Sequence, residues 1–393
     1  MFDEARLDDE EQIARLDRGD TLRALAGAGA QVRRTAAAAQ DAGLHRLDGL
    51  NPRGVVVAAT GGSAAVADLF EAATRGSGAV PVESCRSGPL PGWVGSLDLV
   101  VAVSQSGRAS QSLDLAAEAA RRGAMLLTVG APDSPLAEVS ARARGVHVPV
   151  SAPGSTSRTS MWAQATPVLL AAEVLGLAGT GADCLARIAD VLDARAQDAR
   201  PGSESFVNPA KILATEVAES IAIVLGVGAF GGVAARRAAA MFGRTGRVPV
   251  ASGTLPDMAS QIVACFDGPL AGGEGGDGGG DDLFADPFLD GPTAPPLRLV
   301  MLGEGDSEHR RTPRRAAADG ADPERELVDT VVEAARDAGV RVSHVDALDT
   351  DPLLRLAWHV ALTDFAATYL AIGHGFDPAT SPHVRLLRGS RSR

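Results

Sequence analysis

The chain has 393 residues, of which 45% are hydrophobic and 22% are charged, and its formal net charge is −12. This length favours two domains of ordinary size. The acidic excess argues against nucleic acid as the main partner, because clustered basic residues hold phosphate backbones. The three cysteines, Cys85, Cys184 and Cys265, are widely separated, so the sequence predicts neither a disulfide framework nor a zinc site.

The first 20 residues are acidic and lack the basic flank and apolar core of a signal peptide. The longest apolar stretches, around 166–179 and 221–235, fall short of the ~20 apolar residues that a membrane-spanning helix needs. We therefore expect a cytoplasmic protein without a membrane partner. No residue pattern indicates a metal site or another cofactor, so none is expected.

The first half of the chain alternates between strand and helix patterns after one amphipathic helix over 21–41. Near-continuous apolar strands separated by helices are typical of a parallel sheet that helices cover on both faces. We predict strands over 54–59, 79–83, 97–103, 124–129 and 145–150, and helices over 64–74, 110–122 and 134–144.

A helical connection over about 162–200 leads to a second, weaker series of the same kind. Its predicted helices cover 209–219, 231–242, 257–266, 326–338 and 352–372, and its strands cover 221–225, 297–302 and 341–345. The fold class is therefore α/β, with two tandem domains that each contain a doubly wound, mainly parallel sheet. The predicted divisions are an N-terminal helical segment over 1–48, a first domain over 49–160, the connection over 161–205 and a second domain over 206–393.

Two polar insertions interrupt the second domain. The segment 271–296 is rich in Gly, Asp and Pro, and 305–324 combines an arginine cluster with an acidic end. Both compositions predict disordered loops. A small apolar island over 283–289 is most simply a set of incidental linker residues; the alternative is a docking motif for a protein partner.

Two of the predicted strands end in glycine- and serine-rich turns that lead directly into helices. Such turns present free backbone N–H groups and hydroxyls, and the helix dipole adds positive potential. Two turns on consecutive units can converge on one ligand, which predicts a binder of a small phosphorylated molecule. The alternative for Ser63 or Ser110 taken alone is a helix cap. The candidate phosphate-binding residues are Gly61, Gly62, Ser63, Ser104, Gln105, Ser106, Gly107, Ser110 and Ser112.

The residue order in the first turn disfavours a nicotinamide or flavin cofactor. A dinucleotide fold places G-x-G-x-x-G after its first strand, with an acidic residue about 20 positions later. The run Thr60-Gly61-Gly62-Ser63-Ala64-Ala65-Val66 lacks that spacing.

The turns and their flanks resemble a known family. ATGGSAAVADL and PVESCRSGPLPGWVGSLDLVVAVSQSG resemble the sugar isomerase (SIS) domain, which binds phosphosugars. NPAKILATEVAESIAIVLG, VPVASGTLPD and LTDFAATYLAIGHGFDP resemble the second half of the bifunctional phosphoglucose/phosphomannose isomerase family. This resemblance implies tandem SIS domains, a homodimer, and a sugar-phosphate ligand between domains and subunits. The implied reaction interconverts glucose 6-phosphate or mannose 6-phosphate with fructose 6-phosphate, without a metal.

The resemblance also assigns roles to individual positions. Ser63 matches the family's serine after the first strand, and Ser104 and Ser106 match its phosphate-binding turn. The threonine hydroxyl of that turn is missing at Ala109, where Ser110 or Ser112 could substitute. Arg158 falls where the family has a proline–arginine pair, which makes it a candidate catalytic residue, and the alternative is a surface arginine that caps a helix.

Two positions implied to be catalytic carry different residues. The family's base, a glutamate, is replaced by Arg244, and its ring-opening histidine by Ser260. General acids and bases each supply ~100-fold to ~10,000-fold, so the resemblance implies weak, altered or absent isomerase activity. Four other residues could rescue catalysis, although an exposed helix pair or helix caps explain them more simply: Glu216, Glu219, Asp257 and His374.

The competing function is a non-catalytic sensor or scaffold that binds a sugar phosphate and signals to a partner. A SIS-type transcription regulator would need a DNA-binding helix-turn-helix, and the acidic N-terminus offers none.

Overall fold

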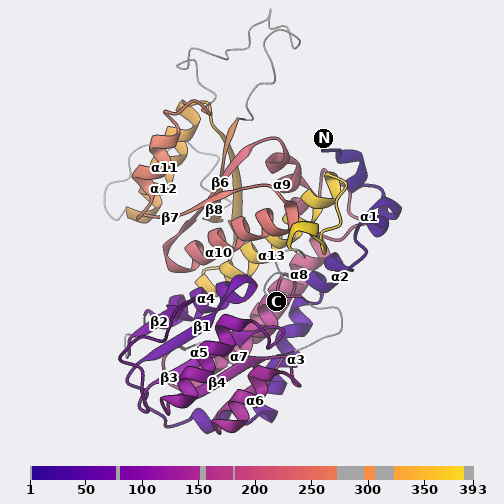
Figure 1. Cartoon of the computed structure of the whole chain (residues 1–393). Helices are drawn as coiled ribbons and strands as arrows, with labels where there is room; N and C mark the ends of the chain where they lie inside the picture. The colour runs from indigo at the N-terminus through magenta and orange to yellow at the C-terminus, as the bar shows by residue number, and fades with distance from the viewer. Residues whose placement is uncertain are drawn as a thin grey trace, which may run out of the picture. The chain divides into compact units, whose positions relative to one another are not determined.

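The computed structural model describes residues 2–76, 80–150, 156–179, 182–271, 296–305 and 323–384. These residues form two compact units, a first unit of Asp20–Gln197 and a second unit of Met1–Gly19 with Asp198–Arg393. Each unit contains its own parallel sheet flanked by helices (Figure 1), which confirms the predicted fold class. The predicted insertions and the 283–289 island lie outside the described residues, apart from end positions of the insertions. The predicted domain boundaries stay a prediction.

The sheet of the first unit has five parallel strands. Their order is β2 (Val82–Cys85), β1 (Val55–Ala59), β3 (Leu99–Ser104), β4 (Met125–Gly130) and β5 (Val146–Pro149). Every residue of β1 and β3 is buried, which explains why these strands are continuous apolar runs.

Helices cover both faces of this sheet. On one face, α5 (Ser110–Arg121) and α6 (Pro135–Arg142) pack on a core from alternate strand residues, including Val56, Val100 and Leu126. Helices α3 (Ala28–Asp41), α4 (Ala64–Thr74) and α7 (Met161–Val174) also contact the strands, and α3 and α4 each pack on α7. In addition, Arg33 of α3 pairs with Asp190 and Asp193 of α8 (Ala182–Asp198).

The single helix predicted over 21–41 is wrong in one respect. The structure breaks it into α2 (Thr21–Ala26) and α3 at Gly27, whose N–H still bonds to the carbonyl of Arg23. Glycine is a weak helix former, so the break occurs there. Before it come a 3₁₀ turn, Glu4–Leu7, and α1 (Glu10–Leu16), which lie in the predicted N-terminal helical segment but were not predicted as separate elements.

The sheet of the second unit has the strand order β7 (Ala251–Leu255), β6 (Ile221–Val227), β8 (Leu297–Glu304) and β9 (Arg341–Ala347), all parallel. Strand β7 was not predicted, because it is an edge strand of small and polar residues with an irregular burial pattern.

The helices of the second unit also lie on two faces of the sheet (Figure 1). On one face, α11 (Ala259–Cys265) and α12 (Pro323–Asp337) join an aliphatic core with β6, β7 and β8. Helices α10 (Gly228–Met241) and α13 (Pro352–Gly373) contact the sheet, and α9 (Pro209–Ala218) packs on α13. None of the helices in the described part of the chain is long and apolar enough to span a membrane.

The only lysine of the chain, Lys211, is a buried structural cation in the second unit. Its Nζ donates to the carbonyls of Ser203 and Pro201 at 2.6 and 2.8 Å and pairs with Asp8 at 3.3 Å. It also lies 5.5 Å from the ring centre of Tyr369. These bonds fasten the N-terminal segment to α9 and α13.

We expect Lys211→Met to lower the free energy of unfolding of the second unit by about 3 kcal/mol or more, because it leaves two carbonyls and a carboxylate without their cation. Urea unfolding followed by circular dichroism measures this. Ile212→Met, at an exposed neighbouring position on the same helix, is the matched control and should change stability by less than ~1 kcal/mol. Equal stability of the two variants would contradict a structural role for Lys211.

His359 of α13 joins the carboxyl ends of β8 and β9. Its Nε2 lies 3.2 Å from the carbonyl oxygen of Gly303 and 3.1 Å from that of Val345, so the ring donates there. Burial lowers the pKa of His359 to about 4, from its usual 6.5. The fold therefore favours the neutral ring. Its contribution to stability is complete above pH 6.5 and is lost as the pH falls toward 4.

The free energy of unfolding of the second unit should therefore drop between pH 7 and pH 4.5, by about 2–3 kcal/mol from this residue. In His359→Gln, an amide that does not titrate replaces the ring, so the drop should be smaller by that amount. Unfolding curves at a series of pH values test this. Parallel pH profiles for the two proteins would show that His359 is not the group responsible.

Candidate functional site

The strand order of the first sheet brings the two serine-bearing turns together. Strand β1 lies between β2 and β3, and Ala59 pairs with Val103, so the turns that follow β1 and β3 leave the same sheet edge side by side. The chain passes from β1 to one side for β2 and then to the other side for β3. In open parallel sheets, such a reversal is where ligands bind.

The first turn is a short 3₁₀ segment, Gly61–Ser63, that leads into α4. Gly61 has a φ of +58°, which favours glycine, and a side chain there would point into open space. Ser63 occupies the N-cap position of α4 but makes no capping hydrogen bond. Instead, its buried hydroxyl donates to Oε1 of Gln164 at 2.6 Å.

Gln164 belongs to α7 and connects this turn to a second loop of the same unit. Its Nε2 donates to the carbonyl oxygen of Ser160 at 3.0 Å, and the hydroxyl of Ser160 donates to the carbonyl of Thr156 at 2.6 Å. The Gln164 side chain is fully buried. A buried chain of hydrogen bonds therefore runs from Ser63 to the loop that contains Arg158.

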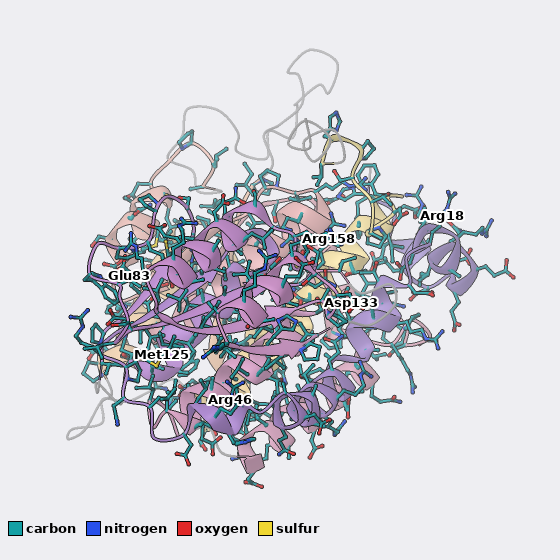
Figure 2. All side chains as sticks on the ribbon, turned by 60° about the horizontal axis from the view of Figure 1, so that its bottom comes forward. Arg18, Arg46, Glu83, Met125, Asp133 and Arg158 are labelled. Carbon is teal, nitrogen blue, oxygen red and sulfur yellow. The ribbon has the colours of Figure 1, made fainter. Side chains whose placement is uncertain are left out.

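Arg158 lies in a compact turn whose ends are fixed from two helices. Its backbone N–H donates to Oγ1 of Thr156 at 3.2 Å, and the next carbonyl, that of Thr159, accepts from Gln31 of α3 at 2.9 Å. Arg158 is 8% exposed. In Figure 2 it lies on the same side of the view as Asp133, which follows β4, and away from Met125, which begins β4. Arg158 is therefore a largely buried cation near the carboxyl edge of the sheet.

The second turn runs from Ser104 to Gly107 and is closed by its own backbone. The N–H of Gly107 donates to the carbonyl of Ser104 at 2.8 Å. Gly107 has a φ of +62°, and a Cβ there would lie 2.1 Å from the hydroxyl oxygen of Ser134, which caps α6. Glycine is thus required twice over, by conformation and by the approach of the next loop.

The four hydroxyls of this turn differ in whether their protons are already used. Ser112 donates to the carbonyl of Val103 and is fully buried, and Ser110 donates to the side chain of Gln111. Ser104 and Ser106 instead accept backbone N–H groups, each at 3.3 Å. A hydroxyl has one proton, so Ser104 and Ser106 retain a donor for an anionic ligand, whereas Ser112 and Ser110 do not.

The charges near these turns favour an anion. Helix α5 begins at Ser110 after Ala109, which provides no capping side chain, so its first N–H groups face the turn with the positive end of the helix dipole. Arg108 lies in the turn itself and is exposed. No described residue pairs with its guanidinium.

The two implied catalytic positions belong to the second unit. Arg244 is half-exposed in a π-helical turn, Phe242–Gly246, after α10, and its charge acts on the buried carboxylate of Asp364. Ser260 is exposed on α11. The structure therefore brings Ser63, Ser104, Ser106 and the Arg158 loop to one edge of the first unit, whereas Arg244 and Ser260 belong to the second unit.

The four residues that could rescue catalysis also lie in the second unit. Glu216 and Glu219 lie on α9 and at its C-cap, half-exposed and exposed. Asp257 is exposed and does not cap α11, whose N-cap is Met258, so the predicted cap is wrong. His374 is the C-cap of α13, as expected, with ring contacts to Phe2 and Phe376. Burial lowers its pKa.

A glycine motif in the second unit has the spacing of a dinucleotide fingerprint, at Gly226, Gly228 and Gly231. It follows β6 and opens α10. However, a Cβ at Gly226 would lie 2.0 Å from the carbonyl oxygen of Gly231, so close backbone packing explains these glycines. The first acidic residue after Gly231 is Asp257, 26 positions on, whereas the fingerprint has one about 20 positions later. No cluster of metal-ligating side chains occurs among the described residues.

Sequence reasoning missed Gln164, which joins the first turn to the Arg158 loop. A signal was present, because Gln164 is an amide within the otherwise apolar run MWAQATPVLLAA. Its partners could not be predicted, since Ser63 lies 101 positions away in the chain.

Residues 206–390 match the family model of the bacterial phospho-glucose isomerase C-terminal SIS domain. No curated protein matches the chain. Among solved structures, a hypothetical protein from Thermus thermophilus is similar with a TM-score of 0.65, at 16% identity over 98% of this chain and 93% of that one. A candidate phosphosugar isomerase from Clostridium difficile 630 has a TM-score of 0.64, at 11% identity over 92% and 97%.

A glucose-6-phosphate isomerase-like protein, also from Thermus thermophilus, is similar with a TM-score of 0.55, at 18% identity over 99% of both chains. At these identities the structures show a shared fold. Residues 206–390 are therefore similar in sequence to an SIS domain, and the chain shares its fold with these solved structures.

We expect Gly107→Ala to disrupt the second turn, because alanine disfavours the positive φ and its methyl group would overlap the Ser134 hydroxyl. The free energy of unfolding should fall by about 1–3 kcal/mol, and binding of inorganic phosphate should weaken. Gly61→Ala is the matched control, since its φ is also positive but the space beside it is open. Equal losses in the two variants would mean that contact with Ser134 is unimportant.

Proposed function

We propose that the first unit binds a hexose 6-phosphate at the carboxyl edge between β1 and β3. The observation that carries this proposal is the adjacency of two strand–turn–helix units at the point where the strand order reverses. The phosphate would occupy the second turn, where Ser104 and Ser106 keep their protons and α5 begins. Gly61 and Gly62 of the first turn would admit the rest of the ligand.

The SIS-domain match of the second half and the phosphosugar-isomerase fold support this ligand class. We further propose that the protein belongs to the bifunctional phosphoglucose/phosphomannose isomerase family, acts as a cytoplasmic homodimer and needs no metal. The reaction of that family moves a proton between adjacent carbons and requires a base and a ring-opening acid. Arg244 and Ser260 provide neither at the corresponding positions.

The proposed activity is therefore binding, with isomerisation to fructose 6-phosphate weak or absent. The substitutions favour a second function, a sugar-phosphate sensor or scaffold that passes its bound state to a partner. Arg244 also reverses the charge of a carboxylate position, which suits a ligand with a second anionic group. A measurement of turnover distinguishes the two functions, because an isomerase converts the bound sugar phosphate and a sensor does not.

The test is calorimetric titration of the purified protein with glucose 6-phosphate and mannose 6-phosphate, together with NMR detection of fructose 6-phosphate. We expect binding, and turnover at least ~10,000-fold below that of an isomerase with both acid–base groups. Ser106→Asp should weaken binding by about tenfold or more, because it places a carboxylate beside the phosphate.

Ser96→Asp is the control for Ser106→Asp, since it introduces the same charge at an exposed position before β3, at the opposite edge of the sheet. It should leave the affinity within about twofold, as expected of an exposed charge far from the ligand. Absence of binding at millimolar concentration would rule out the phosphohexose ligand. Rapid turnover would instead establish an enzyme and overturn the sensor.

A further inference from the structure

Two hydrogen bonds determine which way the amide of Gln164 and the hydroxyl of Ser63 point. The carbonyl of Ser160 can only accept, so the amide nitrogen of Gln164 must face it, at 3.0 Å. The amide oxygen of Gln164 therefore faces Ser63, at 2.6 Å. An amide oxygen cannot donate, so Ser63 supplies the proton of this bond.

This use of the proton leaves Ser63 with only lone pairs for a ligand. A serine hydroxyl has one proton and two acceptor sites. A phosphate group at neutral pH presents mainly acceptor oxygens, so it gains no hydrogen bond from Ser63 and meets its lone pairs. A sugar hydroxyl can donate to Ser63. Ser104 and Ser106, in contrast, accept backbone N–H groups, so their hydroxyl protons can be donated to a phosphate oxygen.

We infer that Ser63 accepts a hydrogen bond from a hydroxyl of the sugar, and that Gln164 is the positioning residue that makes it an acceptor. This inference rests on the proposed function and deepens it, because it assigns the two turns to opposite ends of the ligand. Adjacent strands lie about 4.8 Å apart, so a ligand with its phosphate on the second turn extends over the first turn with its hydroxyl-bearing part.

The arrangement also explains how the Arg158 loop is coupled to the sugar end of the site. Ser160 begins α7 at its N-cap, accepts from Gln164 through its carbonyl and donates through its hydroxyl to Thr156. Arg158 lies between these two residues. The buried amide of Gln164 thus determines the direction of the Ser63 hydrogen bond and also holds the loop that contains Arg158. A ligand without hydroxyls would use the phosphate turn alone.

The test compares two ligands, glucose 6-phosphate and inorganic phosphate, on the full chain. Gln164→Met keeps the length of the side chain, removes the amide and frees the Ser63 proton. We expect affinity for glucose 6-phosphate to fall about three- to tenfold. Affinity for inorganic phosphate should stay equal or rise, because Ser63 can then donate. A purely structural role for Gln164 would lower both affinities together.

Two further variants keep the inference falsifiable if Gln164→Met does not fold. Ser63→Ala removes the acceptor and should also weaken glucose 6-phosphate selectively. Thr166→Val, on the same helix, removes only a bond from Thr166 Oγ1 to the carbonyl of Trp162 at 2.7 Å, and should alter neither affinity.

Each outcome decides between the alternatives. Selective loss of glucose 6-phosphate affinity supports the inference. Equal loss for both ligands, or no change for either, overturns it while the proposed function stands. A wild-type protein that binds inorganic phosphate but no hexose phosphate overturns the proposed function, and the inference with it.

Discussion

The order of the strands in the first sheet is the constraint on which the candidate site depends. Strand β1 must lie between β2 and β3 for the turns after β1 and β3 to be neighbours. Parallel strands joined by helices direct every such turn to one edge, and the chain reverses its direction after β2, which is where open parallel sheets bind ligands. Gly61 and Gly107, both with positive φ, then let each turn bend sharply into its helix.

The two turns at this edge differ in whether their serine hydroxyls can donate a hydrogen bond to a ligand. Ser63 gives its proton to Gln164, whereas Ser104 and Ser106 receive backbone N–H groups and keep theirs. Serines with similar positions in the sequence therefore differ in what they offer a ligand. The difference arises because the partner of Ser63, Gln164, is distant in the chain, whereas Ser104 and Ser106 accept from N–H groups of their own turn.

Much of the fold followed from the sequence, because buried parallel strands are apolar runs of recognisable length. The runs that became β1, β3 and β4 were predicted to within two residues at each end. Strand β7 was missed, since an edge strand with few buried residues has no such pattern. The turns of the site were recognised from glycine and serine spacing. The partner of Ser63 is 101 positions away in the chain and depends on packing across the unit, which local patterns do not encode.

Under the proposed assignment of Arg244 to the base position, Asp364 is the nearby carboxylate to consider as a replacement. Arg244 acts on Asp364, which is a buried carboxylate of α13. Both oxygens of Asp364, however, accept from Arg237, through Nε at 3.1 Å and Nη2 at 2.8 Å, and both side chains are almost fully buried. A carboxylate held in this way has little access to a substrate carbon, and removing it would take away the carboxylate that pairs with a buried guanidinium. Asp364 therefore stabilises the contact between α10 and α13, and we do not propose it as a replacement base.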